Sequence, residues 1–503
     1  MISKVYSYAL EGLNGVPVLV EADVNNGLPA FDIVGLADTA VKESRERVRS
    51  ALKNSGRALP AKRITLNLAP ADFKKEGSHL DLPIAVGVLI ASGQLLVDTK
   101  RTVFLGELSL DGSLRRINGV LPALISALKD GFTDFIIPKE NQKEASFVEG
   151  INVYPAEKLE DVINHLSGLT PIQKIETRDF ISELGKNVYD SDMALVKGQK
   201  VAKRALEVAV SGGHNILFVG APGTGKTMLA KCIPTIMPDL TKEEALETTK
   251  IHSIAGLIKD SEGIVTSRPF RSPHHPSTTV AMTGGGPKIK PGEISLAHNG
   301  VLFLDEMPEY QRSTLEALRQ PLEDGVISIS RANGSITYPA NFILCGSMNP
   351  CPCGNYGSED KVCTCSPQQI AKYNAKISGP LLDRIDIRIE VDSVKYAMLK
   401  SNEVAEDSFT VRQRVNKARD IQRFRFRNDD ILTNADMTEK HIKKYCVLSD
   451  ECEAFLENAY KVLHLSPRAR SRIIKVARTI ADIADSKDIQ KEHILEAISY
   501  RKS

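Results

Sequence analysis

The sequence contains no tryptophan, almost no net charge and no long hydrophobic run. The missing tryptophan decides nothing about function. The 65 Lys and Arg residues balance 63 Asp and Glu, so bulk charge does not indicate nucleic-acid binding, and any DNA site must be local. Residues 82–97 form the most apolar stretch, which is short for a membrane span and favours a buried helix. Residues 1–14 lack the apolar core of a secretory signal, and we therefore expect a cytoplasmic protein without membrane contact.

The eight cysteines are not spread like a disulfide framework. Four of them form two Cys-x-Cys pairs, made by Cys351, Cys353, Cys363 and Cys365. In an intracellular protein this clustering favours a metal site. Four thiolates can close a tetrahedral Zn²⁺ site that leaves no open position for catalysis, so the zinc we expect is structural. Four reduced thiols in a loop are the alternative.

The 503 residues suggest about three domains at roughly 150 residues each. Residues 1–165 mix short alternating strands with helices, and 166–195 show little periodicity and indicate a linker. Residues 196–392 alternate short apolar strands with helices, which is typical of an α/β fold with a buried parallel sheet. Strand signals then end, and 393–503 are predicted to be helical.

The spacing of the apolar residues and the residue types predict the individual strands and helices. We expect strands at 16–24, 63–68, 214–220, 300–304 and 340–347. We expect helices at 38–54, 409–424, 451–463 and 470–483. A further helix is expected to start at Asp81 as N-cap, with Pro83 in its first turn.

A phosphate-binding loop ends the strand predicted at 214–220. The motif GxxxxGK[ST] is matched at every position by Gly220, Ala221, Pro222, Gly223, Thr224, Gly225, Lys226 and Thr227. Its glycines allow backbone N–H groups to surround phosphates at the start of the following helix. We expect Lys226 to neutralise the β- and γ-phosphates of ATP, and Thr227 to bind Mg²⁺.

Polar residues also end the next two predicted strands. Asp305 is expected to hold Mg²⁺, and Glu306 to activate the water that attacks the γ-phosphate. Asn349 follows the strand at 340–347, where its amide would sense the γ-phosphate beside that water. A plain acidic turn and a plain Asn-Pro turn are the respective alternatives.

These motifs resemble an AAA+ ATPase, and the whole chain resembles the ComM (YifB) family of the magnesium-chelatase-like branch. The segments that support this resemblance also include FDIVGLAD (31–38), RSPHHP (271–276), NGVLFLDE (299–306), NPCPCG (349–354), SGPLLDRID (378–386) and VARTIAD (476–482). The resemblance implies an AAA+ P-loop parallel-sheet core with a C-terminal helical lid, preceded by an α+β Lon-protease-like (S5-type) domain. It also implies a homo-oligomeric ring, expected to be a hexamer stimulated by nucleotide or DNA. The implied activity is that of a branch-migration helicase in recombination and natural transformation.

Two arginine roles follow from the resemblance. Arg384 matches the position that reaches the γ-phosphate of a neighbouring subunit, where a cation supplied in trans makes hydrolysis depend on assembly. A surface salt bridge with Asp383 or Asp386 is its alternative. Arg468 matches the lid arginine that senses nucleotide, and its alternative is a surface role at a helix start.

The N-terminal segment also carries a resemblance, to the Lon-type peptidase domain. Ser78 lines up with the peptidase serine, but Leu121 occupies the position of the activating lysine. Lys129 falls on a later helical turn. We therefore expect a retained scaffold without peptidase activity.

Three segments are candidates for contact with single-stranded or branched DNA. The segment 267–291 is long, Gly-rich and basic, which suits a mobile loop facing a ring pore. The segment 330–334 contains an Asn-Gly pair and is predicted to be a hairpin. The segment 412–427 is a basic helix, for which a solvated surface is the alternative.

The prediction is thus a ring-forming ATPase that moves DNA. A magnesium-chelatase motor subunit, a chaperone-like protein remodeller and a Lon-like ATP-dependent protease are the alternatives. The missing lysine argues against the protease. The extra N-terminal domain and the cysteine cluster argue against the chelatase subunit, whereas the sequence does not exclude the remodeller.

Overall fold

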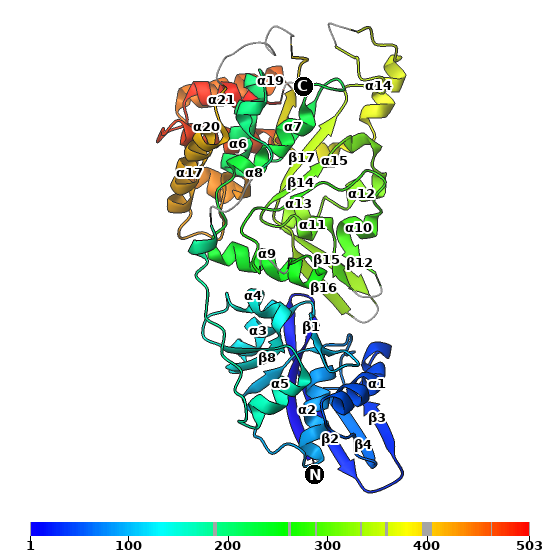
Figure 1. Cartoon of the computed structure of the whole chain (residues 1–503). Coiled ribbons are helices and arrows are strands. Elements are labelled where there is room, and N and C mark those ends of the chain that lie inside the picture. Colours follow the sequence, from blue (N-terminus) through cyan, green and yellow to red (C-terminus); the bar gives the residue numbers. More distant parts are fainter. Residues whose placement is uncertain are drawn as a thin grey trace. The chain divides into compact units, whose positions relative to one another are not determined.

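The computed structural model describes residues 2–184, 189–259, 263–286, 289–331, 334–357, 361–394, 405–463 and 465–501. The chain forms two compact units (Figure 1). Unit 1 comprises Met1–Gly185 and Thr241–Thr266, and unit 2 comprises Lys186–Leu240 and Ser267–Ser503. The polypeptide therefore passes between the units three times.

Unit 1 is built on a seven-stranded mixed sheet with the strand order β3-β4-β2-β1-β5-β8-β9. Its strands are β1 (Ile2–Glu11), β2 (Asn14–Asn25), β3 (Ala30–Val34), β4 (Arg63–Ala69), β5 (Thr102–Phe104), β8 (Asp134–Pro138) and β9 (Asn152–Ala156). The short pair β6 (Glu107–Leu108) and β7 (Leu114–Arg115) stands apart from this sheet. Its main helices are α1 (Thr39–Asn54), α2 (Asp81–Ala91), α3 (Val120–Lys129), α4 (Gln142–Ala145) and α5 (Leu159–Leu166).

The strands predicted at 16–24 and 63–68 and the helix predicted at 38–54 are confirmed. Asp38 caps α1, since its carboxylate accepts a hydrogen bond from the backbone N–H of Val41. The prediction that Asp81 is an N-cap is wrong. Asp81 is the first residue of α2, and its buried carboxylate instead forms an ion pair with Arg47, 2.6 Å from Nε. All of α2 is buried, as the apolar composition predicted.

Helix α9 (Lys242–Ala255) belongs to unit 1, although in sequence it lies between the phosphate loop and Asp305. It packs against α3. The hydroxyl of Ser253 accepts a hydrogen bond from the N–H of Gly119 at 3.1 Å and donates one to the buried carboxylate of Glu144 at 2.8 Å. The predicted domain boundaries, which keep 196–392 together, therefore differ from the compact units of the structure.

Unit 2 contains a five-stranded parallel sheet in the order β11-β14-β17-β10-β18. Figure 1 shows its neighbouring strands β14 and β17. Its strands are β10 (Ile216–Val219), β11 (Phe270–Arg271), β14 (Val301–Leu304), β17 (Ile343–Met348) and β18 (Ile387–Glu390). Three of them confirm the strands predicted at 214–220, 300–304 and 340–347. Two hairpins lie outside the sheet: β12 (Gly284–Gly285) with β13 (Lys290–Pro291), and β15 (Val326–Arg331) with β16 (Gly334–Pro339).

The C-terminal region of unit 2 is helical, as predicted. It contains α17 (Ser408–Arg425), α18 (Glu439–Tyr445), α19 (Asp450–Val462), α20 (Pro467–Ile483) and α21 (Lys491–Ser499). These helices share one hydrophobic core with the parallel sheet, in which Phe218 of β10 and Ile473 of α20 are both buried. Within the described ranges, no helix is long and apolar enough to cross a membrane.

Candidate functional site

The site lies at the carboxyl edge of the parallel sheet in unit 2. Strand β17 runs between β10 and β14 and pairs with both. The phosphate loop follows β10, Asp305 follows β14, and Asn349 follows β17. The strand order therefore places Asn349 between the other two motifs, as expected for a ligand site at the ends of parallel strands.

The phosphate loop leads into α7 (Lys226–Lys231), so that Lys226 is the first helical residue. The preceding Gly225 has a φ of 91°, a left-handed conformation that L-residues rarely adopt, and it turns the chain into the helix. The ammonium of Lys226 donates to the carbonyls of Gly220 at 2.6 Å and Ala221 at 2.9 Å, and to Oδ1 of Asn349 at 3.3 Å. Burial lowers the pKa of Lys226, while the carboxylates of Asp305 and Glu306 oppose that shift.

The proposed magnesium ligands contact one another. The hydroxyl of Thr227 donates to Oδ2 of Asp305 at 3.0 Å. The other oxygen of Asp305 accepts a hydrogen bond from the buried hydroxyl of Ser347. A threonine hydroxyl and a carboxylate are oxygen ligands of the type that Mg²⁺ prefers, so these residues fit the metal of a nucleotide site.

Ser347 is a site residue that sequence reasoning missed. Its hydroxyl accepts a hydrogen bond from the backbone N–H of Glu306 at 3.1 Å, in addition to donating to Asp305. One serine thus orients both acidic positions. The available signal was a polar residue near the end of an otherwise apolar buried strand.

Glu306 has an unusual backbone. Its φ of 51° puts a non-glycine residue in the left-handed region, and its side chain is exposed. Such strain is commonly held at functional sites, where the surroundings fix it. The bond from the Glu306 N–H to Ser347 is one interaction that holds this conformation here.

The two arginines of the resemblance lie near one carboxylate. Arg384 follows α15 (Gly379–Leu382), is 12% exposed, and forms an ion pair with Glu323. The hydrogen bond and the positive charge of Arg384 lower the pKa of Glu323, and the positive charge of Arg468 lowers that pKa further. The partner of Arg384 is therefore neither Asp383 nor Asp386. Asp386 instead binds His214, with 3.1 Å between Oδ2 and Nδ1.

Arg468 lies in the first turn of α20 and is exposed. It lines an open cavity of about 760 Å³ together with Glu439, Glu453 and Arg470. Because Arg468 and Arg384 both act on Glu323, the two sequence-predicted arginines lie on the same part of unit 2.

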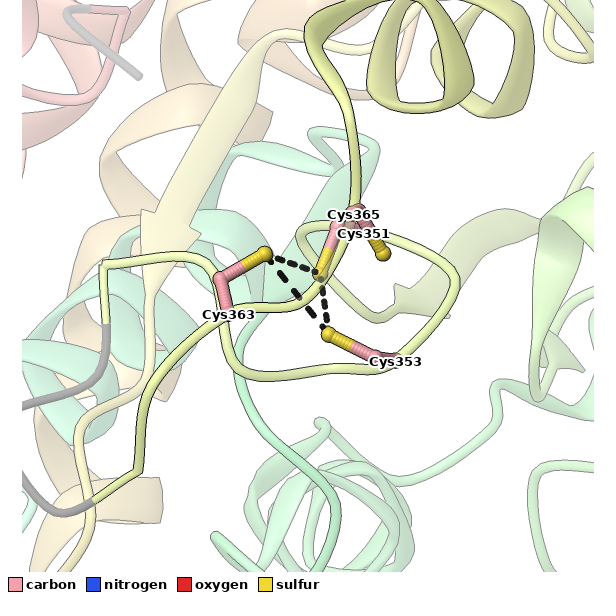
Figure 2. A group of neighbouring side chains, drawn as sticks. All are labelled: Cys351, Cys353, Cys363 and Cys365. Carbon is pink, nitrogen blue, oxygen red and sulfur yellow. Dashed lines mark hydrogen bonds between the residues drawn. The ribbon is translucent and has the colours of Figure 1, made fainter.

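The four clustered cysteines converge as the sequence predicted (Figure 2). Their sulfur atoms all lie within 4.8 Å of one another. The distances from Cys351 Sγ are 3.4 Å to Cys353 and 3.7 Å to Cys363, and the distance from Cys353 to Cys363 is 3.6 Å. All four are free cysteines. Tetrahedral thiolates at a Zn–S distance of about 2.3 Å lie about 3.8 Å apart, so the cluster fits a Zn²⁺ ion.

Ser78 in unit 1 contacts a carboxylate. Its hydroxyl donates to Glu107, and Leu121 is buried in α3 as a core residue. The neighbouring Lys75 is also buried, and its ammonium donates to the carbonyl of Phe73 at 3.0 Å. Burial lowers the pKa of Lys75. The absence of peptidase activity stays a prediction.

The candidate DNA segments differ in how many of their charges are paired. The basic helix is α17, and five of its cations form ion pairs within unit 2: Arg412 with Asp239, Arg414 with Glu207 and Glu406, Lys417 with Asp485, Arg423 with Asp420, and Arg425 with Asp482. A sixth cation, Arg419, donates a hydrogen bond to the carbonyl of Val210. These internal partners disfavour α17 as a DNA surface.

The other two segments form the hairpins of unit 2. They lie side by side, because the hydroxyl of Tyr338 in β16 donates to the carbonyl of Ile289 at 3.0 Å. The basic residues Arg268 and Arg271 at the start of the first segment bind within the unit, Arg268 to the carbonyl of Asn299 and Arg271 to Glu293. Lys288, Ala332 and Asn333 lie outside the described residues.

Comparison with known proteins gives matches along the whole chain. A family model described as magnesium chelatase, subunit ChlI, matches residues 192–399. Models described as subunit ChlI of Mg-chelatase and as magnesium chelatase, subunit ChlI C-terminal, match 20–141 and 405–501. Competence protein ComM of Haemophilus influenzae is 46% identical over 99% of this chain and 97% of its own length.

Two further relatives extend this picture. The uncharacterized protein YifB of Escherichia coli is 44% identical over 99% of this chain and 97% of its own length. A probable DNA helicase, MCM9 of Arabidopsis thaliana, is more distant, at 25% identity over 55% of this chain and 36% of its own length.

Proposed function

The chain belongs to the magnesium-chelatase-like family that includes competence protein ComM and YifB, and on that premise we propose that it is a ring-forming ATPase that moves DNA. The family implies ATPase activity. The observation that carries the proposal is the contact between Lys226 and Asn349, together with that between Thr227 and Asp305. Three separate motifs thus meet at one sheet edge with the chemistry that ATP hydrolysis needs.

Each residue then has a role at the bound nucleotide. Backbone N–H groups of Gly220–Thr227 and the ammonium of Lys226 bind the phosphates, while Thr227 and Asp305 hold Mg²⁺. Glu306 orients and deprotonates the attacking water, and Asn349 senses the γ-phosphate. Arg384 completes the ATP site of the next subunit, and Arg468 is the lid arginine that senses the nucleotide. A hexamer is the expected ring.

DNA is the substrate that we favour. The relatives' names support this choice, since one is a competence protein and a distant one a probable DNA helicase. The paired hairpins β12–β13 and β15–β16 are the proposed contact, because they lie side by side and present the exposed Lys290. We propose branch migration of single-stranded or branched DNA in recombination, in the cytoplasm.

We also propose that the four cysteines hold one structural Zn²⁺. Purified protein prepared without chelator should contain about one zinc per chain by elemental analysis. Replacement of Cys351 and Cys365 by Ser should abolish it, because two thiolates do not close a tetrahedral site. Zinc-free wild-type protein would contradict the assignment.

The decisive experiment measures ATPase rates with and without single-stranded, duplex and four-way-junction DNA. Stimulation should be largest with the preferred DNA structure and should fall as salt rises, because phosphate contacts release counterions. An ATPase that responds to none of these DNAs at low salt would favour the protein-remodelling alternative.

A further inference from the structure

The cysteine loop packs directly on the phosphate loop. Gly354, the residue after Cys353, has a φ of 79°. A Cβ built on Gly354 would lie 2.5 Å from Cδ and 2.9 Å from Cγ of Pro222. Both distances are shorter than real Cβ contacts, so the backbone of Gly354 approaches the ring of Pro222 more closely than a residue with a side chain could. Pro222 belongs to the phosphate-binding motif itself.

The same segment also encloses Asn349. Cys351 lies two residues after Asn349 and is completely buried. After Cys365, Ser366 caps α14 (Pro367–Asn374), which carries the buried Tyr373. A Cβ built on Gly354 would also lie 3.9 Å from Cγ of Asn349, so the cysteine loop lies against Asn349 as well as Pro222. The segment that gathers the four cysteines therefore both follows Asn349 and lies against it.

We propose that metal occupancy of the cysteine cluster and nucleotide occupancy of the phosphate loop are coupled. Metal held by the four cysteines positions Pro222 and Asn349 for ATP, and bound nucleotide in turn slows release of the metal. This inference rests on the proposed ATP site and on the proposed Zn²⁺ site. The cysteines are positioning residues here, because they act on nucleotide through Pro222 and Asn349.

The coupling has a simple physical origin. Without metal, Gly354 must lose conformational freedom each time it packs against Pro222. Four metal–sulfur bonds remove that freedom beforehand, so nucleotide binding no longer includes this cost. Linkage requires that nucleotide stabilise the metal-bound loop by the same factor, and such factors are commonly about 5- to 150-fold.

A pair of matched glycine variants isolates the contact. Gly354→Ala keeps all four cysteines but forces a methyl group against Pro222. Gly357→Ala is the control, since Gly357 has a similar φ of 77° but nothing within 4 Å of an added Cβ. Both variants should keep one zinc. Gly354→Ala should bind MgADP about tenfold more weakly than Gly357→Ala, a change within the usual range of such coupling.

The reciprocal measurement uses the wild-type chain. Zinc release to a chelating dye should be several-fold slower with saturating MgADP, and Lys226→Ala should show no such protection. Suppose that the protein binds both zinc and MgADP but releases zinc at the same rate with and without nucleotide. That result would overturn the coupling and leave the two proposed sites in place. Protein that lacks zinc, or that fails to bind MgADP, would overturn it together with the proposal on which it rests.

Discussion

The ammonium of Lys226 lies 3.3 Å from Oδ1 of Asn349, and this contact joins the phosphate loop to the end of strand β17. It shows that the amide of Asn349 is within reach of the group expected to bind the γ-phosphate. Since Asn349 also begins the cysteine segment, nucleotide chemistry and the cysteine cluster share this one residue.

Separating binding from hydrolysis tests the assigned roles. Lys226→Ala should abolish ATP binding, because it removes the cation expected to bind the β- and γ-phosphates. Glu306→Gln should still bind ATP but lose turnover by about 100-fold or more, because the water is no longer deprotonated. Equilibrium binding of a fluorescent nucleotide and steady-state ATPase assays measure the two effects. Normal turnover in Glu306→Gln would remove the assignment of the base.

Ser347→Ala tests the residue that the sequence did not reveal. Loss of a hydrogen bond to a charged group costs about 1.5–3 kcal/mol, so kcat should fall by about tenfold or more and the Mg²⁺ requirement should rise. Ser295→Ala is the matched control. Ser295 is also a buried serine of unit 2, but its hydroxyl has no hydrogen-bond partner among the described residues. Equal activity of the two variants would show that Ser347 does not orient Asp305.

The sequence was informative wherever local pattern decides structure. The strand before Gly220, the strand before Asp305 and three of the helices after residue 405 were predicted, because period and turn chemistry act over a few residues. The convergence of four cysteines also followed, because the spacing of the pairs limits where the chain can go.

Features that depend on distant partners could not be predicted in the same way. The role of Asp81 depends on Arg47, which lies on another helix and turns an apparent cap into a buried ion pair. The pairing of Arg384 with Glu323 joins residues about sixty positions apart. The membership of α9 in unit 1 depends on Ser253 and its contacts with α3 and α4, for which no local pattern exists.

His79, whose Nε2 is buried without a hydrogen-bond partner among the described residues, predicts a pH dependence of the stability of unit 1. Burial lowers the pKa of His79 from 6.5 to about 4, while the charge of Asp38 opposes the shift. Between about pH 4 and pH 6.5, His79 binds a proton in the unfolded chain but not in the folded chain. The resulting stability is complete above pH 6.5 and is lost as the pH falls towards 4, by up to about 3 kcal/mol.

His79→Phe should therefore reduce the slope of stability against pH in this range, whatever its effect at pH 7. Urea unfolding of the full chain, followed by hydrogen exchange in peptides from β1 and β2, measures the slope for unit 1. An unchanged slope in His79→Phe would assign the pH dependence to other groups, such as His165, whose pKa burial also lowers.

The trans role of Arg384 predicts complementation between two inactive variants. Arg384→Ala should bind ATP through its intact phosphate loop but hydrolyse it poorly, and Lys226→Ala should be inactive for the opposite reason. In a mixed ring, some interfaces combine an intact phosphate loop from one subunit with an intact arginine from its neighbour. ATPase activity of titrated mixtures should therefore exceed that of either variant alone.

Glu323→Gln provides the control for this experiment. Glu323 is the carboxylate that pairs with Arg384 within the subunit, and its side chain is 60% exposed. Neutralising it removes the competing partner without removing the guanidinium, so hydrolysis should be retained or increased in the pure variant. If Arg384 instead acts within its own subunit, every subunit of a mixed ring carries a complete defect. Cross-linking of differently tagged subunits shows whether the two variants assemble together. If they do and no mixture recovers activity, the trans assignment is rejected, because an intact phosphate loop beside a neighbour's intact arginine would then not hydrolyse ATP.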